Sequence, residues 1–426
     1  MGARVSVRRL PVRPDLEQLK RQAKELLRAL HHGEPEALAE YREHHPHPGD
    51  PAAAKLADAQ LVLARCYQAP SWPRLVQACR LANAIWRDDA ETVQELVTRN
   101  PAMLTEPAII RRDSHWGPPL SYAANLGRDR IIRMLHALGA TDLAYARDRA
   151  ALQGQIGTVR MLHEMLGQPR PPAASLAGPA YTLSAAGTEV LLELGAPVLG
   201  PDGRRLAPVD VVLETDSRKP DEKHRILEMY AARGVEMPDT PPLAVHRGRL
   251  DLLEKHLRRD PRQLRRTYAF REIFPPELGC HEDPLPTHGT PLSGATLLHM
   301  AVDYDELEIA RWLLDRGMNV DAKAELDRDG FGGHTALFAT VVSQPAFWMN
   351  HLGKPREAPF AQLLLERGAN PNARASLRKQ LHPGYGEDGT HEYRDVTPLA
   401  WGRRFHRPIF VSEPAMQLIA ERGGRE

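Results

Sequence analysis

The sequence predicts an all-α protein, a solenoid of stacked helix-turn-helix units with a helical extension before the stack and loop inserts towards its end. The chain has 426 residues, too many for one compact core, so several domains or an elongated array are expected. Aromatic residues make up only 6% of the chain, and alanine and leucine dominate its apolar residues, which favours closely packed helices over a β-sandwich. A short helical pattern also recurs from residue 82 onwards, which is typical of a repeat architecture.

The first part of the chain predicts a disordered start, residues 1–14, followed by a helical extension over residues 15–81. In the run DLEQLKRQAKELLRALHHG, the leucines and one alanine fall at the i, i+3, i+4 spacing of an amphipathic helix. Asp15 is placed to start this helix and Gly33 to end it. Shorter helices are expected in PEALAEYREHH and KLADAQLVLARCY, and Ser71 is placed to cap the next one.

From residue 82 to 426 the chain repeats one unit: a turn, a helix of small residues, a break, and a leucine-rich helix that ends in glycine. The clearest copy begins at Gly294 and reads GATLLHMAVDYDELEIARWLLDRGMNVDA. A second copy reads HTALFATVVS and, after an insert, FAQLLLERGANPNA. A third begins at Thr397 as TPLAWG and ends as PAMQLIAERGG. Earlier copies, such as GPPLSYAANLGRDRIIRMLHALGATD, are weaker, and the pattern is eroded over about residues 142–240.

These copies resemble the ankyrin repeat family, whose unit of about 33 residues carries a T-P-L-H-x-A signature. The resemblance covers most of the chain after residue 82. The segment ahead of it is similar to a helical extension that precedes ankyrin arrays in some bacterial proteins. The resemblance implies roughly eight or nine repeats in a curved solenoid, whose concave face of turns and first helices binds macromolecular partners.

The signature has a physical basis. Thr at the turn caps the first helix with its hydroxyl, and the φ angle of the following Pro is preset for the first helical turn. Glycine after the second helix takes the left-handed conformation that ends it. Thr240, Thr335 and Thr397 fit the capping position, whereas Pro118 replaces it in one copy. One helix pair cannot bury its apolar face alone, so neighbouring pairs must stack.

Four inserts interrupt the array, at about residues 268–293, 344–359, 376–395 and 403–413. Long loops without secondary structure are uncommon in compact proteins and tend to be functional or disordered. Inserts in repeat arrays usually collect on one face. We therefore expect these inserts to build a lobe over the C-terminal repeats.

Composition argues against several classes of protein. A net charge of +1 provides no general field for nucleic acid or an anionic membrane, and no run of about 18 apolar residues predicts a membrane span. The start has arginines but no apolar core, so no secretory signal is expected. Three widely spaced cysteines require no oxidising compartment. We expect a cytoplasmic protein, and the excess of arginine over lysine is typical of a GC-rich bacterial genome.

No cofactor is expected from the motifs. Residues Gly330–Gly333 lack the Lys-Ser/Thr of a phosphate-binding loop, and the metal-binding spacing H-E-x-x-H is absent. Among the 19 histidines, His299, His334 and His391 are candidates for a metal site formed by the inserts. The alternative is that they are ordinary repeat and loop residues. His299 occupies the T-P-L-H position, where the histidine of the family is structural.

Aromatic residues in turns, first helices and inserts are a stronger indication of a site, because Trp, Tyr and Arg dominate protein interfaces. Arg404, beside two aromatic residues, suggests an anchor for an acidic or aromatic partner. The alternative is that the inserts pack on themselves and the rings form a satellite core. The candidate partner surface consists of Trp116, Tyr122, Tyr304, Phe331, Phe347, Trp348, Tyr393, Trp401, Arg404 and Phe405.

These observations favour a protein–protein interaction module that holds a macromolecular partner on the concave face and inserts of the array. The main alternative is an enzyme, with or without a metal ion, whose site lies under the C-terminal inserts. Cys280 next to His281 leaves a nucleophile pair open there. A third possibility is a toxin-neutralising or host-directed effector, which is a binding module with a particular partner. The partner is expected to be a protein, and neither nucleic acid nor a membrane.

Overall fold

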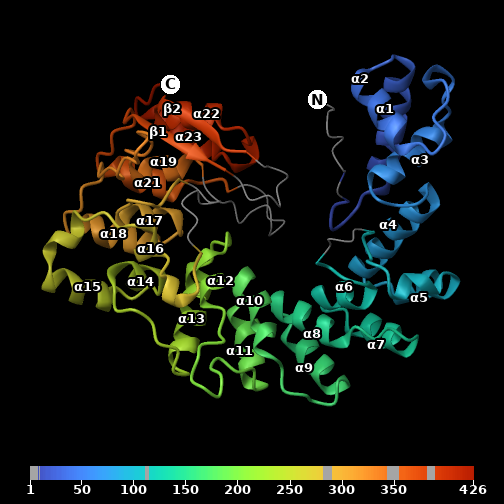
Figure 1. Ribbon diagram of the computed structural model, residues 1–426, viewed down its shortest axis with the longest axis horizontal. Coiled ribbons are helices and arrows are strands. Elements are labelled where there is room, and N and C mark those ends of the chain that lie inside the picture. Colours follow the sequence, from blue (N-terminus) through green and yellow to red (C-terminus); the bar gives the residue numbers. More distant parts are fainter. Residues whose placement is uncertain (1–7, 9, 111–114, 282–289, 343–354, 381–388) are drawn as a thin grey trace. The chain divides into compact units, whose positions relative to one another are not determined.

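The computed structural model describes residues 8, 10–110, 115–281, 290–342, 355–380 and 389–426, and these are mostly helical (Figure 1). The chain forms two compact units, Met1–Arg170 and Pro171–Glu426. The fold class expected from the sequence, an all-α repeat solenoid, is confirmed apart from one β-hairpin. No helix within the described ranges is long and apolar enough to cross a membrane.

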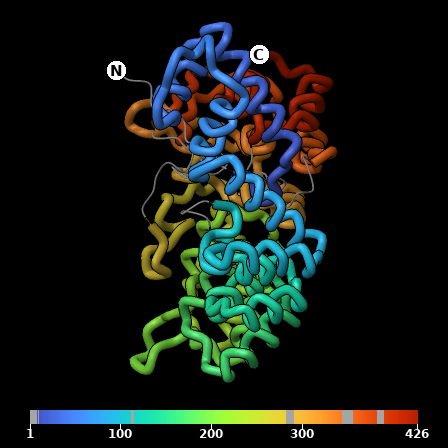
Figure 2. Tube along the Cα trace, turned by 90° about the vertical axis from the view of Figure 1, so that its right-hand side faces the viewer, coloured from blue at the N-terminus to red at the C-terminus, as the bar shows by residue number. Residues whose placement is uncertain are grey.

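The first unit begins with three helices and continues as helix pairs. Helix α1 packs on α2 and α3, and α3 packs on α4. From α4 onwards first helices alternate with second helices, so that α4, α6 and α8 are neighbours and α5 lies against α7 (Figures 1 and 2). The helices are α1 (Leu16–His31), α2 (Pro35–His44), α3 (Leu56–Cys66), α4 (Trp72–Trp86), α5 (Ala90–Arg99), α6 (Pro119–Asn125), α7 (Asp129–Ala137), α8 (Leu143–Leu152) and α9 (Ile156–Met165), with 3-10 turns at Pro51–Ala53 and Pro101–Leu104.

The N-terminal segment is held against the first unit. Arg8 forms an ion pair with Glu40, and Leu10 is buried. The backbone carbonyls of Val12 and Pro14 accept hydrogen bonds from Tyr122 and Asn83. The predicted disordered start is therefore corrected for residues 8 and 10–14, while residues 1–7 and 9 lie outside the described part. The sequence did not predict this docking, because the side chains that bond to these carbonyls come from distant helices.

The second unit continues the same plan. First helices pack on first helices (α10 on α12, α14 on α17, α17 on α19, α19 on α22), and second helices pack on second helices (α11 on α13, α18 on α21, α21 on α23). Counting from α4–α5, the described residues contain nine such helix pairs. The helices are α10 (Ala177–Thr182), α11 (Ala185–Glu193), α12 (Val209–Glu214), α13 (Pro220–Ala231), α14 (Pro241–His246), α15 (Leu250–Arg259), α16 (Phe270–Ile273), α17 (Leu297–Asp303), α18 (Leu307–Asp315), α19 (Ala336–Val341), α21 (Pro359–Glu366), α22 (Pro398–Arg404) and α23 (Glu413–Glu421), with 3-10 turns at Ala173–Leu176, Pro261–Leu264, Pro276–Leu278 and Pro408–Phe410.

Two of the three threonines predicted to cap first helices do so. The hydroxyls of Thr240 and Thr397 accept hydrogen bonds from the backbone N–H groups of Leu243 and Ala400, three residues on. Thr335 precedes α19 without a capping bond from its side chain, so the capping role expected for this residue is wrong. Gly317 follows α18 with φ +85°, the left-handed conformation that glycine adopts at low cost.

The insert expected as a loop at about residues 376–395 contains an antiparallel β-hairpin. Strands β1 (Ala375–Lys379) and β2 (His391–Val396) pair with Leu377 opposite Tyr393. The turn before α19 is linked to β1 by an isolated bridge, in which the backbones of Gly332 and Ser376 exchange hydrogen bonds. These strands are short and their pattern is broken by the segment between them, which explains why the sequence predicted no strand here.

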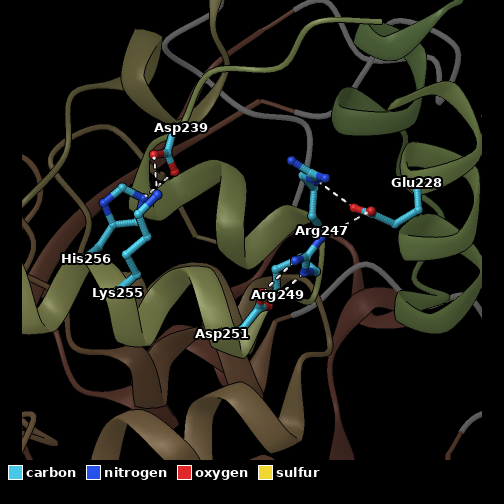
Figure 3. A network of polar contacts seen from close by, with 7 residues as sticks. All are labelled: Glu228, Asp239, Arg247, Arg249, Asp251, Lys255 and His256. Carbon is cyan, nitrogen blue, oxygen red and sulfur yellow. Dashed lines mark hydrogen bonds and ion pairs between the residues drawn. The ribbon is translucent and has the colours of Figure 1, made fainter. Parts of the chain in front are cut away.

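Surface ion pairs join neighbouring helix pairs of the second unit (Figure 3). Glu228 on α13 accepts hydrogen bonds from Arg247 (2.7 Å) and Arg249 (3.3 Å), which lie in the turn between α14 and α15. Arg249 also pairs with Asp251 at 2.6 Å. Because these side chains are partly exposed, each pair stabilises the fold by about 1 kcal/mol at most. Together they orient the α14–α15 turn against α13.

Candidate functional site

A cluster of arginine and aromatic side chains lies on the first helices of the first unit. Tyr145 and Arg149 are four residues apart on α8 and therefore lie on one face of that helix. Trp116 lies in the turn before α6, and Asn125 ends that helix. Tyr145 is 42% exposed, whereas Arg149 is only 9% exposed. The cluster thus presents one accessible ring beside a nearly buried cation.

Arg149 is a buried cation without an acidic partner among the described residues. Its Nε donates a hydrogen bond to the side-chain oxygen of Asn125 at 3.1 Å, and its guanidinium lies 5.9 Å from the centre of the Trp116 ring. The two terminal nitrogens make no protein hydrogen bond within the described ranges and are not sealed from solvent. Burial lowers the pKa of this guanidinium. Buried arginines are normally paired, so this arrangement requires an explanation.

The aromatic part of the site is held rigidly. The Tyr145 hydroxyl donates a hydrogen bond to the backbone carbonyl of His115 at 2.7 Å. Gly117 has φ +73°, and a Cβ atom at this position would lie 2.7 Å from the Tyr145 ring. The turn can therefore approach α8 this closely only with glycine at position 117. As a result, the Tyr145 ring is fixed and its hydroxyl is already occupied.

The buried ring of Tyr122 packs against Trp116. The two rings are 5.2 Å apart. The Tyr122 hydroxyl accepts a hydrogen bond from Trp86 Nε1 at 2.6 Å and donates one to the carbonyl of Val12, also at 2.6 Å. Tyr122 is fully buried, so the partner contact expected for it is corrected: it positions Trp116 and does not reach the surface. Trp116 itself is half-buried and remains a candidate for contact.

Sequence reasoning missed Tyr145 and Arg149. Both lie in the stretch where the repeat signature is eroded, so no motif marked them. The available signal was the Tyr-x-x-x-Arg spacing, which places the two side chains on one helical face. That spacing alone does not show that the arginine lacks an acid, because its surroundings come from α6 and the preceding turn.

Tyr304 lies in a buried charge cluster of the second unit. Its hydroxyl donates to the Leu213 carbonyl at 3.0 Å, and its ring is flanked by the cations of Arg218 (4.7 Å) and Lys223 (4.3 Å). Because the ring is buried, the partner contact expected for Tyr304 is corrected. The surrounding cations are paired: Arg218 with Asp303 at 2.9 Å, and Lys223 with Glu306 at 3.0 Å. This cluster is therefore built to stabilise the fold.

The other predicted rings of the second unit are also buried wherever the structure describes them. Phe331 lies between the guanidinium groups of Arg378 (3.9 Å) and Arg394 (4.3 Å). Tyr393 packs edge-on against Trp401 at 4.7 Å. The expected surface role is corrected for these rings, which form the satellite core that the sequence left as the alternative. The buried set is Phe331, Tyr393, Trp401 and Phe405, while Arg404 is exposed and Phe347 and Trp348 lie outside the described residues.

The candidate metal-binding histidines are engaged in structural contacts. His299 pairs through Nδ1 with the Thr296 hydroxyl at 2.8 Å and through Nε2 with the His334 carbonyl at 3.0 Å. Burial lowers the pKa of His299 to about 4 and of His334 to about 3. His391 stacks on His406 at 3.6 Å. Within the described ranges, no three His, Cys, Asp or Glu side chains gather as a metal site requires.

A comparison with family models agrees with the clearest copy of the repeat pattern. Residues 293–325, which span α17 and α18, match the family model described as Ankyrin repeat. A search of solved structures finds the crystal structure of the human ASB11 ankyrin repeat domain, with 18% identity over 72% of this chain and 99% of that one, at a TM-score of 0.25. A search of curated proteins finds no match.

Proposed function

We propose that this chain is a protein-interaction module whose partner contacts the cluster of Trp116, Tyr145 and Arg149. Ankyrin repeats are in general protein-binding units, which use first helices and turns as the binding surface. The single observation that carries the proposal is Arg149, a buried cation without an acidic partner among the described residues, next to an exposed tyrosine. Such a group is stabilised when a partner supplies the missing acceptor.

The cluster is better suited to binding than to chemistry. Tyr, Trp and Arg are the residue types that contribute most to interfaces, and rings already fixed lose little conformational entropy on binding. The enzyme alternative has no comparable support among the described residues. Burial raises the pKa of the Cys280 thiol, which is the opposite of what a nucleophilic cysteine needs. We place the interaction in the cytoplasm, where unpaired cysteines stay reduced.

The inserts of the second unit are proposed as a separate contact region. Leu326 is 65% exposed in the turn before α19, and that turn is fixed to the hairpin by the bonds between Gly332 and Ser376. Arg378 also pairs with Asp329 of the turn at 2.8 Å. Exposed Arg404 offers a further charged contact. A fixed turn with an apolar tip is suited to contact a partner surface.

Quantitative capture of a partner from the native cells tests the proposal. Tagged full-length protein should retain one protein near stoichiometrically, and Tyr145→Ala should lose it. Tyr181→Ala is the matched control, because Tyr181 is an equally exposed tyrosine on a first helix of the second unit. Both variants should keep the helicity of the native chain. If no protein is retained, or if Tyr145→Ala retains as much as Tyr181→Ala, the proposed surface is wrong.

A further inference from the structure

We infer that the Arg149 site binds a side-chain carboxylate of an acidic, extended segment of the partner, an inference that rests on the proposed function. The inference starts from the charge of the site. Arg149 is nine-tenths buried and pairs with no carboxylate within the described ranges. Its Nε is occupied by Asn125, while its two terminal nitrogens make no hydrogen bond within the described ranges and keep some contact with solvent. Two adjacent N–H groups of a guanidinium match the two oxygens of a carboxylate.

The number of positive charges favours a carboxylate over a phosphate. Phosphate groups carry nearly two negative charges and are usually bound by several arginines. The next cation along α8 is Arg147, but it is buried and paired with Asp148 at 2.9 Å. Among the residues that the structure describes, Arg149 therefore offers this site one uncompensated charge, which a single carboxylate neutralises. The two adjacent N–H groups of the guanidinium and the single charge of the site therefore both favour a carboxylate.

The surrounding rings define what accompanies the carboxylate. Because the Tyr145 hydroxyl already donates to the His115 carbonyl, Tyr145 offers a partner its ring rather than a hydrogen-bond donor. Trp116 contributes a second ring beside the guanidinium. An acidic residue next to an apolar one fits this arrangement, with the carboxylate on Arg149 and the apolar side chain on Tyr145. A short acidic peptide with apolar neighbours is thus the class of ligand expected.

A peptide array tests this inference with the full-length chain. Three pools of immobilised nonapeptides share random apolar flanks and differ at one central position, which is Glu, Gln or phosphoserine. The Glu pool should retain the protein at least about tenfold better than the Gln pool, as a charge-assisted pair predicts. Arg149→Met should abolish this preference, and Arg149→Lys should weaken it, since an ammonium cannot form the two-pronged contact. Arg130→Met, which removes an exposed arginine of the same unit, should leave it unchanged.

Each other outcome has a definite meaning. Equal retention of the Glu and Gln pools overturns the inference, and so does a preference that survives in Arg149→Met. Stronger retention of the phosphoserine pool overturns it in favour of a phosphopeptide. Folding is checked by helicity and melting temperature, which Arg149→Met should not lower, because the substitution removes an unpaired buried charge. If Tyr145→Ala loses the cellular partner but the Glu pool is not preferred, the proposed function stands and only the carboxylate assignment fails.

Discussion

Arg218 and Asp303 form a buried ion pair, 2.9 Å between Nη2 and Oδ2, although 85 positions separate them in the sequence. Arg218 Nε also donates a hydrogen bond to the Asp303 backbone carbonyl at 2.5 Å, and the guanidinium covers the ring of Tyr304. The pair joins the loop before α13 to the end of α17. Because both charges have left water, each depends on the other for its stabilisation.

Asp303→Ala is therefore expected to lower the free energy of unfolding by about 3–5 kcal/mol, since it leaves the Arg218 guanidinium buried without its hydrogen-bonded carboxylate. Urea unfolding followed by circular dichroism measures the change. Glu189→Ala is the matched control, because Glu189 forms a half-exposed pair with Arg225 at 3.4 Å. Its removal should cost less than about 1 kcal/mol. Equal effects of the two substitutions would show that the buried pair contributes no special stability.

The buried amine of Lys379 should make the stability of the folded chain depend on pH. This residue of β1 is buried, and burial lowers the pKa of its amine from 10.5 to about 7, with the Arg218 charge adding to the effect and Asp303 opposing it. Between these two pKa values the unfolded chain binds a proton that the folded chain does not. The contribution of Lys379 to stability therefore rises with pH across this window, by up to about 1.4 kcal/mol per pH unit.

Lys379→Met measures this contribution by difference. The variant should be more stable than the native chain near pH 7, and its advantage should shrink as the pH rises towards 10. Taking the difference cancels other groups, such as the Cys66 thiol, whose raised pKa of about 12 lowers stability at alkaline pH in both proteins. A difference that stays constant between pH 7 and pH 9 would mean that Lys379 titrates normally in the folded chain.

The sequence predicted the clearest helix pairs well because they carry local signals. A Thr cap such as Thr397, a run of small residues and a closing Gly such as Gly317 act within a few residues of each other. The exposure of the rings was not predictable in this way. Tyr304 is covered by cations from α13 and the loop before it, more than 80 positions earlier, and Trp401 by the hairpin of an insert. Burial of this kind depends on tertiary packing, which no local pattern encodes.

Local signals also decide which residues of the candidate site could be predicted. Trp116 could be predicted because it lies in a turn beside a recognisable repeat. The significance of Arg149 depends on an absence, the lack of an acid near its guanidinium among the described residues. The missing acid can be recognised only once the positions of α6 and α8 relative to each other are known.

Gly332 is expected to be intolerant of any side chain. Its φ angle is +120°, and a Cβ atom would lie 2.0 Å from the backbone oxygen of Glu325, which cannot move away as a side chain could. Gly332→Ala should therefore lower the free energy of unfolding by more than about 2 kcal/mol. Gly330→Ala is the control, because Gly330 has φ +80° but open space around it, so only about 1 kcal/mol of backbone strain is expected. Thermal unfolding of both variants decides the comparison, and similar losses would contradict the close approach.

Tyr122→Phe is expected to loosen the N-terminal segment. The substitution removes only the oxygen that accepts from Trp86 and donates to the Val12 carbonyl. Because both partners then lose a partly buried bond to a fully buried ring, the free energy of unfolding should fall by about 1–3 kcal/mol. Fluorescence anisotropy of a dye on the N-terminal amine should also fall, as the segment around Val12 gains freedom.

Tyr145→Phe is the matched control for this change, since Tyr145 is exposed and its hydroxyl makes one bond, to the His115 carbonyl. That carbonyl can bond to water instead, so the loss should be about 1 kcal/mol or less, and the anisotropy should not change. If the dye is equally mobile in Tyr122→Phe and in the native chain, the Tyr122 hydroxyl does not hold the segment. The docking of residues 10–14 would then depend on the burial of Leu10 and on the bond between Asn83 and the Pro14 carbonyl.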